Sequence, residues 1–355
     1  MQHTNRLLIV ALAALSLIAC EKPEPTPGPS DTIVPDSGSA LVLNEGTWGG
    51  NNASLTRMNL AEGTLENNWF RHNNDRNLGD LAQDLVVYGT KAYVTISESG
   101  SLEVIDTATG HSTHVDLSPR YPRCIAACDG KLYISCYKPH SVIRIDTATL
   151  QIEATCELGG YNPEGLAAAH GMILVASSNV SDEQGNYSYD NKVYAINIAT
   201  FSVNNTIEVG SNPQKVILLD SVTAVVNYWG DYASAPAGAA VINLGTMAVT
   251  QLGEELTGMT VANGYIYGYR TTWAPDYSSK STSFVKTDAA GNTSSILPNV
   301  NLNAYSIGVH PVSGNIYVGT DGDYSSNGDL HCFTPDGVQR WKREVGMLPS
   351  KIVFF

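Results

Sequence analysis

The sequence lacks most of the signatures by which an enzyme or a nucleic-acid-binding protein is recognised. Its 20 Lys and Arg residues stand against 34 Asp and Glu residues, which gives a formal net charge of −14. Binding to a phosphate backbone needs a concentrated basic surface, so nucleic acid is an improbable partner. The sequence also has no His-Glu-x-x-His zinc motif, no Gly-x-Ser-x-Gly nucleophile motif and no phosphate-binding glycine loop. We therefore expect a protein that is not an enzyme and that requires no cofactor.

Helical periodicity is absent as well. Instead, apolar and polar residues alternate in short segments rich in Val, Ile, Thr and Tyr, as in Ser101-Leu-Glu-Val-Ile105 and Ser141-Val-Ile-Arg-Ile145. Gly, Asn, Asp and Ser separate these segments, as is typical of strands joined by tight turns. The pattern predicts an all-β protein.

The one long apolar run lies at the amino terminus. It covers residues 7–19, follows Arg6 and ends at Cys20. The run is too short for a membrane-spanning helix and indicates a secretion signal. Small residues before Cys20 resemble the bacterial lipoprotein signal, which implies cleavage there and acylation of Cys20. We predict a signal peptide over residues 1–19, a lipid-anchored Pro-rich tether over residues 20–39 and one domain over residues 40–355.

Cysteine is scarce beyond that point. An odd number cannot all pair within the chain, and the spacing does not suggest a zinc site. We favour buried single thiols, and a disulfide remains an alternative in an oxidising compartment. The residues concerned are Cys124, Cys128, Cys136, Cys156 and Cys332.

An internal repeat organises the rest of the chain. Three segments begin alike: Pro122-Arg-Cys-Ile-Ala, Pro163-Glu-Gly-Leu-Ala and Pro213-Gln-Lys-Val-Ile. Each begins a short apolar strand that is followed by a polar turn and further strands. Corresponding points recur about every 40 to 50 residues, the period of a four-stranded propeller blade. The repeats number seven.

The two ends of the domain complete each other. Residues 349–355 begin a repeat that the chain does not finish, and residues 40–70 finish a repeat that has no beginning. We predict a seven-bladed β-propeller whose first blade takes its innermost strand from residues 350–355, so that the ring has no free central edge. An open solenoid and two packed sandwiches are the alternatives.

The connections between strands suggest where a ligand would bind. Turns on one rim are short, such as Gly89-Thr90 and Asp129-Gly130, whereas loops on the other rim are long and aromatic. Exposed aromatic residues among Gly, Asn and Ser are typical of binding surfaces, and Trp48, Trp229 and Trp273 are the expected anchors. The full set of predicted ligand-binding residues is Trp48, Asn51, Asn52, His72, Arg76, Tyr137, Tyr161, Tyr187, Tyr189, Tyr228, Trp229, Tyr232, Arg270, Trp273, Tyr277 and Tyr324.

One acidic loop places oxygen donors at alternate positions. Asp321, Asp323 and Asp329 could hold a hard cation such as calcium. The spacing misses the twelve-residue calcium loop and its final Glu, so a solvated acidic loop is the favoured interpretation and we predict no metal.

Two sets of residues carry a resemblance to a known family. Ile105-Asp-Thr-Ala-Thr109 and Ile145-Asp-Thr-Ala-Thr149 resemble the strand ends of YncE-like, surface-layer-type propellers. Leu43-Asn-Glu-Gly-Thr-Trp48, followed by Asn52-Ala-Ser-Leu55, is similar to the lipidated propellers of Bacteroidetes, which include the BtuG-type cobalamin-binding proteins.

This resemblance implies a lipoprotein of the outer membrane, held there by its lipid anchor alone and displayed on the cell surface, with a periplasm-facing display as the alternative. Such a protein would capture cobalamin or a similarly large cofactor on one rim and pass it to a TonB-dependent transporter. A glycan- or protein-binding propeller acting in adhesion or as a scaffold is the second hypothesis, and a propeller lyase or lactonase is the third. Fold alone does not choose among them.

Overall fold

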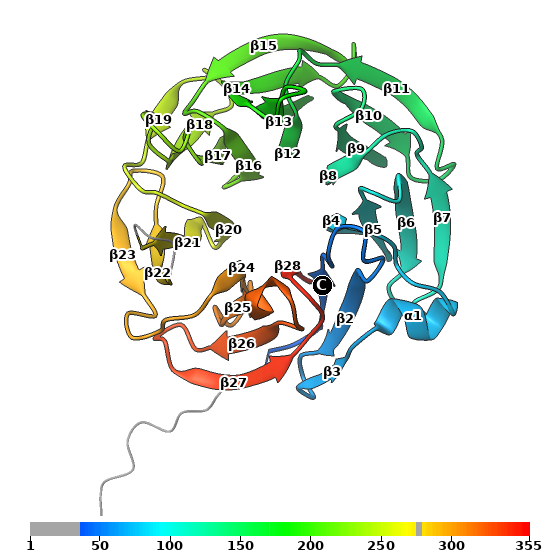
Figure 1. Cartoon of the computed structure of the whole chain (residues 1–355), viewed down its shortest axis with the longest axis vertical. Coiled ribbons are helices and arrows are strands. Elements are labelled where there is room, and N and C mark those ends of the chain that lie inside the picture. The colour runs from blue at the N-terminus through cyan, green and yellow to red at the C-terminus, as the bar shows by residue number, and fades with distance from the viewer. Residues whose placement is uncertain (1–35, 170, 275–278) are drawn as a thin grey trace, which may run out of the picture. The chain divides into compact units, whose positions relative to one another are not determined.

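The computed structural model describes residues 36–169, 171–274 and 279–355. These residues form seven antiparallel sheets of four strands, arranged in a ring (Figure 1). The inner strands line a central channel. The predicted seven-bladed, all-β propeller is therefore confirmed. The signal peptide and most of the tether lie outside the described residues. In the part of the chain that is described, no helix is long and apolar enough to cross a membrane.

Within each blade the strands follow one another outward from the channel. Blade one contains β28 (Pro349–Phe354), β1 (Ser39–Asn44), β2 (Ser54–Asn59) and β3 (Thr64–Glu66). Blade two contains β4 (Ala82–Tyr88), β5 (Lys91–Ile96), β6 (Ser101–Asp106) and β7 (Ser112–Asp116). Blade three contains β8 (Pro122–Cys128), β9 (Lys131–Cys136), β10 (Ser141–Asp146) and β11 (Ile152–Glu157).

The other four blades have the same order. Blade four contains β12 (Pro163–Ala169), β13 (Met172–Ser181), β14 (Tyr187–Asn197) and β15 (Ser202–Glu208). Blade five contains β16 (Pro213–Leu218), β17 (Thr223–Tyr228), β18 (Gly238–Asn243) and β19 (Val249–Gln251). Blade six contains β20 (Gly258–Ala262), β21 (Tyr265–Trp273), β22 (Lys280–Thr287) and β23 (Thr293–Ile296). Blade seven contains β24 (Ala304–Val309), β25 (Ile316–Thr320), β26 (Asp329–Phe333) and β27 (Gln339–Glu344), with a short 3-10 helix at Gly322–Tyr324.

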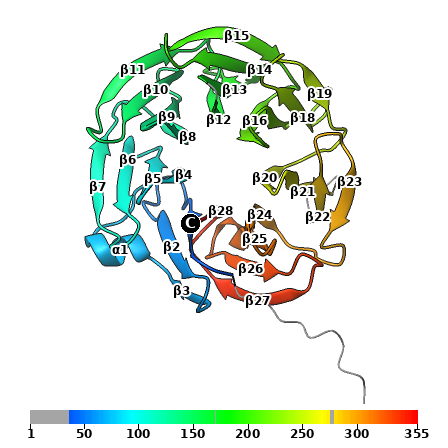
Figure 2. The same cartoon turned by 180° about the vertical axis from the view of Figure 1, so that it is seen from behind.

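The ring closes at blade one as predicted. β28 pairs antiparallel with β1, with Val42 opposite Ile352 and Leu41 opposite Val353. The outermost residues of the pair are joined too, because Ser39 and Phe355 exchange both backbone hydrogen bonds at 2.8 and 2.9 Å. The carboxyl-terminal strand thus supplies the inner edge that residues 39–66 lack, and both views show β28 on the inner side of the ring between β24 and β4 (Figure 1 and Figure 2).

The Asp and Asn residues that end the third strands have a definite structural role. The Asp106 carboxylate accepts hydrogen bonds from the backbone N–H groups of Ala108 and Thr109, at 3.1 and 2.8 Å. Asp146 does the same for Ala148 and Thr149, at 3.0 and 2.8 Å. A short side chain that replaces a backbone acceptor in this way stabilises a tight turn. The repeated motif is therefore a turn signal.

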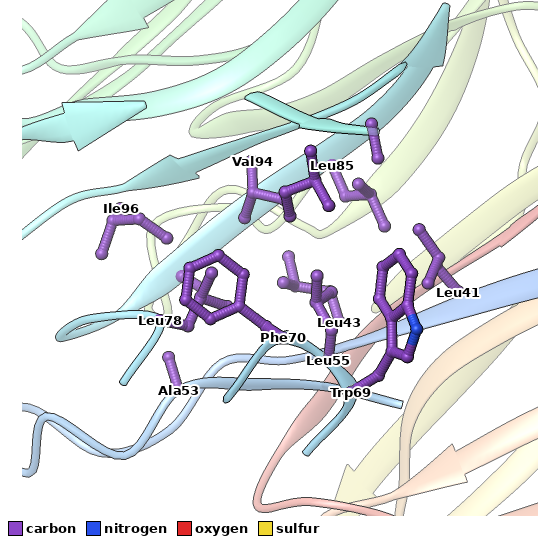
Figure 3. Packing of buried hydrophobic residues seen from close by; sticks show 13 residues of the cluster. Leu41, Leu43, Ala53, Leu55, Trp69, Phe70, Leu78, Leu85, Val94 and Ile96 are labelled. Carbon is purple, nitrogen blue, oxygen red and sulfur yellow. The ribbon is translucent and has the colours of Figure 1, made fainter. Parts of the chain in front are cut away.

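A short helix, α1 (Trp69–Asn74), is the main departure from the sequence expectation of no helix. It has no side-chain N-cap, and a helix of six residues is not stable by itself. Burial maintains it, because Trp69 and Phe70 are almost fully buried. Figure 3 shows both rings among Leu43, Leu55 and other aliphatic side chains of blades one and two. The helix therefore forms from tertiary packing and not from local propensity.

Candidate functional site

A wide cavity runs along the central channel. Its volume is about 1260 Å³, and its wall is formed by the inner strands of all seven blades together with loops of one rim. The inner strands begin at that rim, since the connections between blades lie there. Side chains near the start of an inner strand therefore lie at the mouth of the channel, and later ones lie deeper.

A β-bulge recurs at the start of the inner strands and determines which side chains face the mouth. In β16, for example, Pro213 pairs with Tyr228 and Lys215 with Asn227, so Gln214 has no partner. The same irregularity occurs in β28, β4, β8, β12 and β24, whereas β20 pairs regularly. A bulge leaves the extra residue unpaired and redirects its side chain. The extra residues all line the cavity: Gln83, Arg123, Cys124, Glu164, Gly165, Gln214, Tyr305 and Ser350.

These bulge residues join a belt of hydrogen bonds around the mouth. Glu45, which directly follows β1, accepts hydrogen bonds from Gln83 Nε2 at 2.7 Å and from the Tyr305 hydroxyl at 2.5 Å. Tyr305 belongs to blade seven and Gln83 to blade two. Burial and the Glu45 carboxylate raise the pKa of Tyr305, so that its hydroxyl remains a donor. Glu45 thereby connects three consecutive blades.

The belt continues through Arg123 into blades three and four. The Arg123 guanidinium donates to Gln83 Oε1, contacts both Glu164 oxygens at 3.3 Å and lies 4.6 Å from the Tyr137 ring centroid. The Tyr137 hydroxyl donates to Glu164 as well. Burial opposes the charge of Arg123, but the Glu164 carboxylate outweighs it and raises the pKa of the guanidinium. We call Glu45, Gln83, Arg123, Glu164, Tyr137 and Tyr305 the channel belt.

A second layer of charged side chains lies below the channel belt, one residue farther along the inner strands. Lys351 forms an ion pair with Asp84, whose oxygens also accept hydrogen bonds from the backbone N–H groups of Leu85 and Ile125 at 2.9 Å each. Lys215 and Cys124 lie in the same layer. Burial, together with the Asp84 and Glu164 carboxylates, raises the pKa of the Cys124 thiol, so that it remains protonated. Beyond this layer the wall is mostly apolar.

Aromatic side chains from the long loops surround the opening. Trp229, Tyr232, Trp273 and Tyr324 all line the cavity and are 37, 72, 46 and 52% exposed. Lys280 lies 5.3 Å from the Trp273 ring centroid and 5.2 Å from that of Tyr324, and its charge is paired with Asp321. The Trp229 indole N–H donates to the Thr257 carbonyl at 3.0 Å. We call these four rings the aromatic mouth.

Further tyrosines extend the aromatic mouth over blade four. Tyr189 packs edge-on against Tyr232 with ring centroids 6.0 Å apart, and Tyr187 stacks on Tyr189 at 6.4 Å. The three rings form a continuous strip from the channel opening outward. In blades four and six the expected long loops are partly strand, because Tyr187 and Tyr189 lie in β14 and Trp273 ends β21. These extended hairpins, with the connections between second and third strands of blades five and seven, bring together many of the aromatic residues that the sequence predicted.

Several predicted ligand-binding residues lie elsewhere. Trp48 is 77% exposed but does not line the channel cavity. Asn51 and Asn52 border a separate pocket of about 250 Å³ with Phe70 and Arg71. The Tyr228 side chain is buried in the core of blade five, and its hydroxyl donates to Gln251 at 2.5 Å.

His72 and Arg76 belong to the side of the ring. His72 lies on α1 and contacts Glu66 at 3.2 Å. Arg76 forms a bidentate ion pair with the buried Glu103 at 2.9 and 2.7 Å. Tyr161 is partly buried and Arg270 is exposed, both outside the cavity wall. Tyr277 lies outside the described residues.

The three carboxylates of the acidic loop in blade seven each have a different partner. Asp321 is buried and paired with Lys280, Asp323 accepts a hydrogen bond from Asn303 at 3.4 Å, and Asp329 pairs with Lys342 at 2.8 Å. Within the described ranges, no group of three His, Cys, Asp or Glu side chains is arranged to hold a metal ion. All five cysteines that the structure describes are free thiols.

Sequence reasoning missed most of the polar channel wall. Glu45, Gln83, Arg123, Glu164 and Lys215 were not among the predicted binding residues. A signal was nevertheless present, since Arg123, Glu164 and Gln214 each follow the proline that begins an inner strand. These residues can be recognised as part of the channel wall by their position in the repeat, and not by their residue type.

Comparisons with solved structures support the fold. A quinonprotein alcohol dehydrogenase-like protein from Bacteroides thetaiotaomicron has 13% sequence identity and a TM-score of 0.65, covering 90% of this chain and 78% of that chain. Hydrazine synthase from Kuenenia stuttgartiensis has 16% identity and a TM-score of 0.61, with 76 and 88% covered. The structure of U3-55K has 11% identity and a TM-score of 0.56, with 75 and 82% covered. At these identities the likeness concerns the fold alone.

Sequence comparisons give the family. No curated protein matches the chain. Residues 38–220, just over half of the chain, match the family model described as a domain of unknown function, DUF5074. The matched segment contains blades two to four and the outer strands of blade one. The chain therefore belongs to the DUF5074 family, as a seven-bladed propeller similar in fold to a protein of Bacteroides.

Proposed function

We propose that the protein captures a large ligand at the aromatic mouth of its channel, cobalamin or a cofactor of similar size, without transforming it. The observation that supports this proposal is the cavity itself. Its volume of about 1260 Å³ exceeds the roughly 300–1,000 Å³ of pockets that hold drug-sized molecules. Rigid aromatic side chains surround its opening, and hydrogen-bonding groups lie directly beneath them. A broad, partly apolar molecule with peripheral amides would suit this combination.

Binding without catalysis fits the state of the channel carboxylates. Glu45, Asp84 and Glu164 each accept hydrogen bonds or ion pairs from neighbouring side chains. Carboxylates held in this way are already committed to the wall, which favours a rigid recognition surface over a general acid or base. A lyase or lactonase that used two carboxylates of the wall would have to release at least one of these three, because Glu255 is the one other carboxylate among the described residues of the cavity.

The proposed setting is the outer membrane. A lipid on Cys20 would attach the protein to the outer membrane. The tether of residues 20–39 would hold the propeller away from the bilayer, on the outside of the cell. The proposed partner is a TonB-dependent transporter that receives the ligand. These parts of the proposal rest on the sequence resemblance.

Isothermal titration of the protein lacking residues 1–30 with cyanocobalamin tests the proposal. We expect saturable binding with a stoichiometry of one, accompanied by a change in the corrinoid absorption spectrum. Dicyanocobinamide, which lacks the nucleotide arm, shows whether the ring or the arm is recognised. Absence of heat and of spectral change with both compounds would overturn the corrinoid assignment.

A glycan ligand is the second candidate. The strip formed by Tyr187, Tyr189 and Tyr232 offers successive ring faces, and sugars stack on such faces. A glycan array then separates the two candidates. Signal on the array, together with no response to either corrinoid, would favour adhesion or scaffolding over cofactor capture.

A further inference from the structure

Lys215 differs from the other cations of the channel wall. Of the residues that the structure describes, the basic ones that line the cavity are Arg123, Lys215, Lys280 and Lys351. Three of them have a carboxylate within ion-pair distance, supplied by Glu164, Asp321 and Asp84. Among the described residues, Lys215 has none. Within the described part of the chain, its ammonium makes one hydrogen bond, a long one of 3.4 Å to the carbonyl of Met259.

The surroundings of Lys215 do not compensate its charge. The residue follows the bulge of β16, and its side chain is half-buried in the second layer of the channel. The groups that act electrostatically on Lys215 are the Lys351 ammonium, the Asp84 carboxylate and the Cys124 thiol of blades one, two and three. Burial and the like charge of Lys351 lower the pKa of Lys215. Asp84 opposes this, but its oxygens already bind Lys351 and two backbone N–H groups.

The backbone of blade four packs closely against the backbone at Lys215, so the position of the Lys215 Cα atom is fixed. A Cβ atom on Gly165 of β12 would lie 2.7 Å from the Lys215 Cα and 2.6 Å from the Gln214 carbonyl oxygen. The glycine therefore permits blades four and five to meet at the channel, and it fixes where the Lys215 side chain begins. Of the acidic wall residues, Glu255 also lacks an ion pair among the described residues, but it is exposed.

A partly desolvated ammonium without a counter-ion is unfavourable, and an anion that reaches it regains the lost interaction. We propose that Lys215 of blade five, together with Lys351 of blade one, binds an oxyanion, a phosphate or carboxylate group, carried by the arm of a ligand whose body rests on the aromatic mouth. This inference rests on the proposed capture role and specifies the ligand as a two-part molecule. Its broad part contacts the four rings, and its anionic arm passes the channel belt.

Small anions test this site directly. Inorganic phosphate and, separately, acetate are titrated with the purified full chain and followed by the phosphorus or carbon NMR signal of the anion. We expect binding of at least one anion at millimolar concentration. Phosphate binding alone indicates a phosphate ester as the arm, and acetate binding alone indicates a carboxylate. Binding of neither anion would overturn the inference.

Three variants locate the bound anion. Lys215→Met keeps the aliphatic length and removes the charge, and we expect affinity to fall by at least about tenfold, the loss of one charged hydrogen bond. Lys215→Arg should retain binding within about threefold. Lys342→Met is the matched control, because Lys342 lies on β27, the outermost strand of blade seven, and forms an ion pair with Asp329. Equal affinity of Lys215→Met and the unmodified protein would refute the assignment.

The outcome separates this inference from the capture role. If cyanocobalamin binds and Lys215→Met binds it equally well, capture stands and the oxyanion site is wrong. If phosphate or acetate binds at Lys215 while both corrinoids fail, the oxyanion site stands and the corrinoid assignment falls. Circular dichroism of each variant confirms that the fold is unchanged.

Discussion

Trp229 offers the sharpest test of the aromatic mouth. Its ring lines the cavity and is only partly exposed, and its N–H is held by Thr257. Anchors of this kind dominate binding energy because they are fixed before the ligand arrives. We expect Trp229→Ala to weaken ligand binding by about 1–2 kcal/mol, or roughly tenfold, in isothermal titration, with little change in thermal unfolding.

Tyr265→Ala is the control for that variant. Tyr265 follows the short turn between β20 and β21, on the opposite rim, and is 40% exposed. Its loss should leave affinity unaltered. A large fall in thermal stability of Trp229→Ala, with affinity preserved, would reassign the ring to a structural role.

Glu103 gives the protein an acid-sensitive ion-pair network. Its side chain is 1% exposed and accepts hydrogen bonds from Arg76, Ser112 and His114. Burial opposes the charge, but these partners prevail and lower the pKa of Glu103. A carboxyl group with a lowered folded-state pKa stabilises the fold above its unfolded pKa of about 4.3, and that contribution is lost as pH falls through the folded value.

We therefore expect Glu103→Gln to reduce the urea midpoint at pH 7, and the difference from the unmodified protein to shrink as pH falls below about 4. Urea unfolding across that range measures it. Glu62→Gln, at an exposed turn of blade one, should leave the midpoint unchanged at every pH. A constant difference between Glu103→Gln and the unmodified protein at all pH values would contradict the role given to the charge.

The closing strand is the element on which the ring depends. Ile352 of β28 faces Val42 across the pair and is packed with Ala40, Val42 and Tyr317. Truncating a buried aliphatic side chain leaves a cavity, at a cost of about 2–4 kcal/mol. Ile352→Ala should therefore lower the free energy of unfolding by that amount in denaturant titration.

Val338→Ala serves for comparison, since Val338 is 60% exposed in the turn before β27. Its effect should stay within about 0.5 kcal/mol. If both variants were equally stable, the Ile352 side chain would contribute nothing to holding the closing strand in place.

For the whole ring, ligand binding should increase the free energy of unfolding. A ligand that bridges several blades binds the folded ring and not the unfolded chain, so saturation raises the unfolding free energy. At a hundred times the dissociation constant the gain is about 2.7 kcal/mol. We expect cyanocobalamin to raise the unfolding temperature by a few degrees in calorimetry, and Trp229→Ala to show a smaller rise at the same concentration. An unchanged temperature would contradict capture in the channel.

Attachment to the membrane is a separate property of the whole chain. Cys20 lies outside the described residues, and its acylation is a prediction. We expect Cys20→Ser to move the protein from the membrane fraction to the soluble fraction after secretion, because the lipid would be lost. Fractionation and immunoblotting measure this. Persistence of the variant in the membrane fraction would contradict a lipid anchor.

The fold was accessible from the sequence because its signals are local. Alternating apolar residues, the prolines that begin inner strands and the Asp or Asn turn residues all act within a few positions of one another. Repetition of these signals indicated the number of blades, and the mismatched ends indicated the closing pair. Helix α1 escaped because Trp69 and Phe70 are ordered by burial between blades one and two and not by helical pattern.

The sequence by itself thus determined the all-β class, the seven repeats, the closure of blade one and the rim that carries the aromatic loops. Tertiary structure decided the composition of the binding surface. Glu45 and Tyr305 are 260 positions apart and become neighbours only when the ring closes. Among the described residues Lys215 has no ion-pair partner, because Asp84, the carboxylate that acts on it, already binds Lys351. Turns and strands are fixed by short-range geometry, whereas a charge network in a channel depends on residues that all seven blades must first bring together.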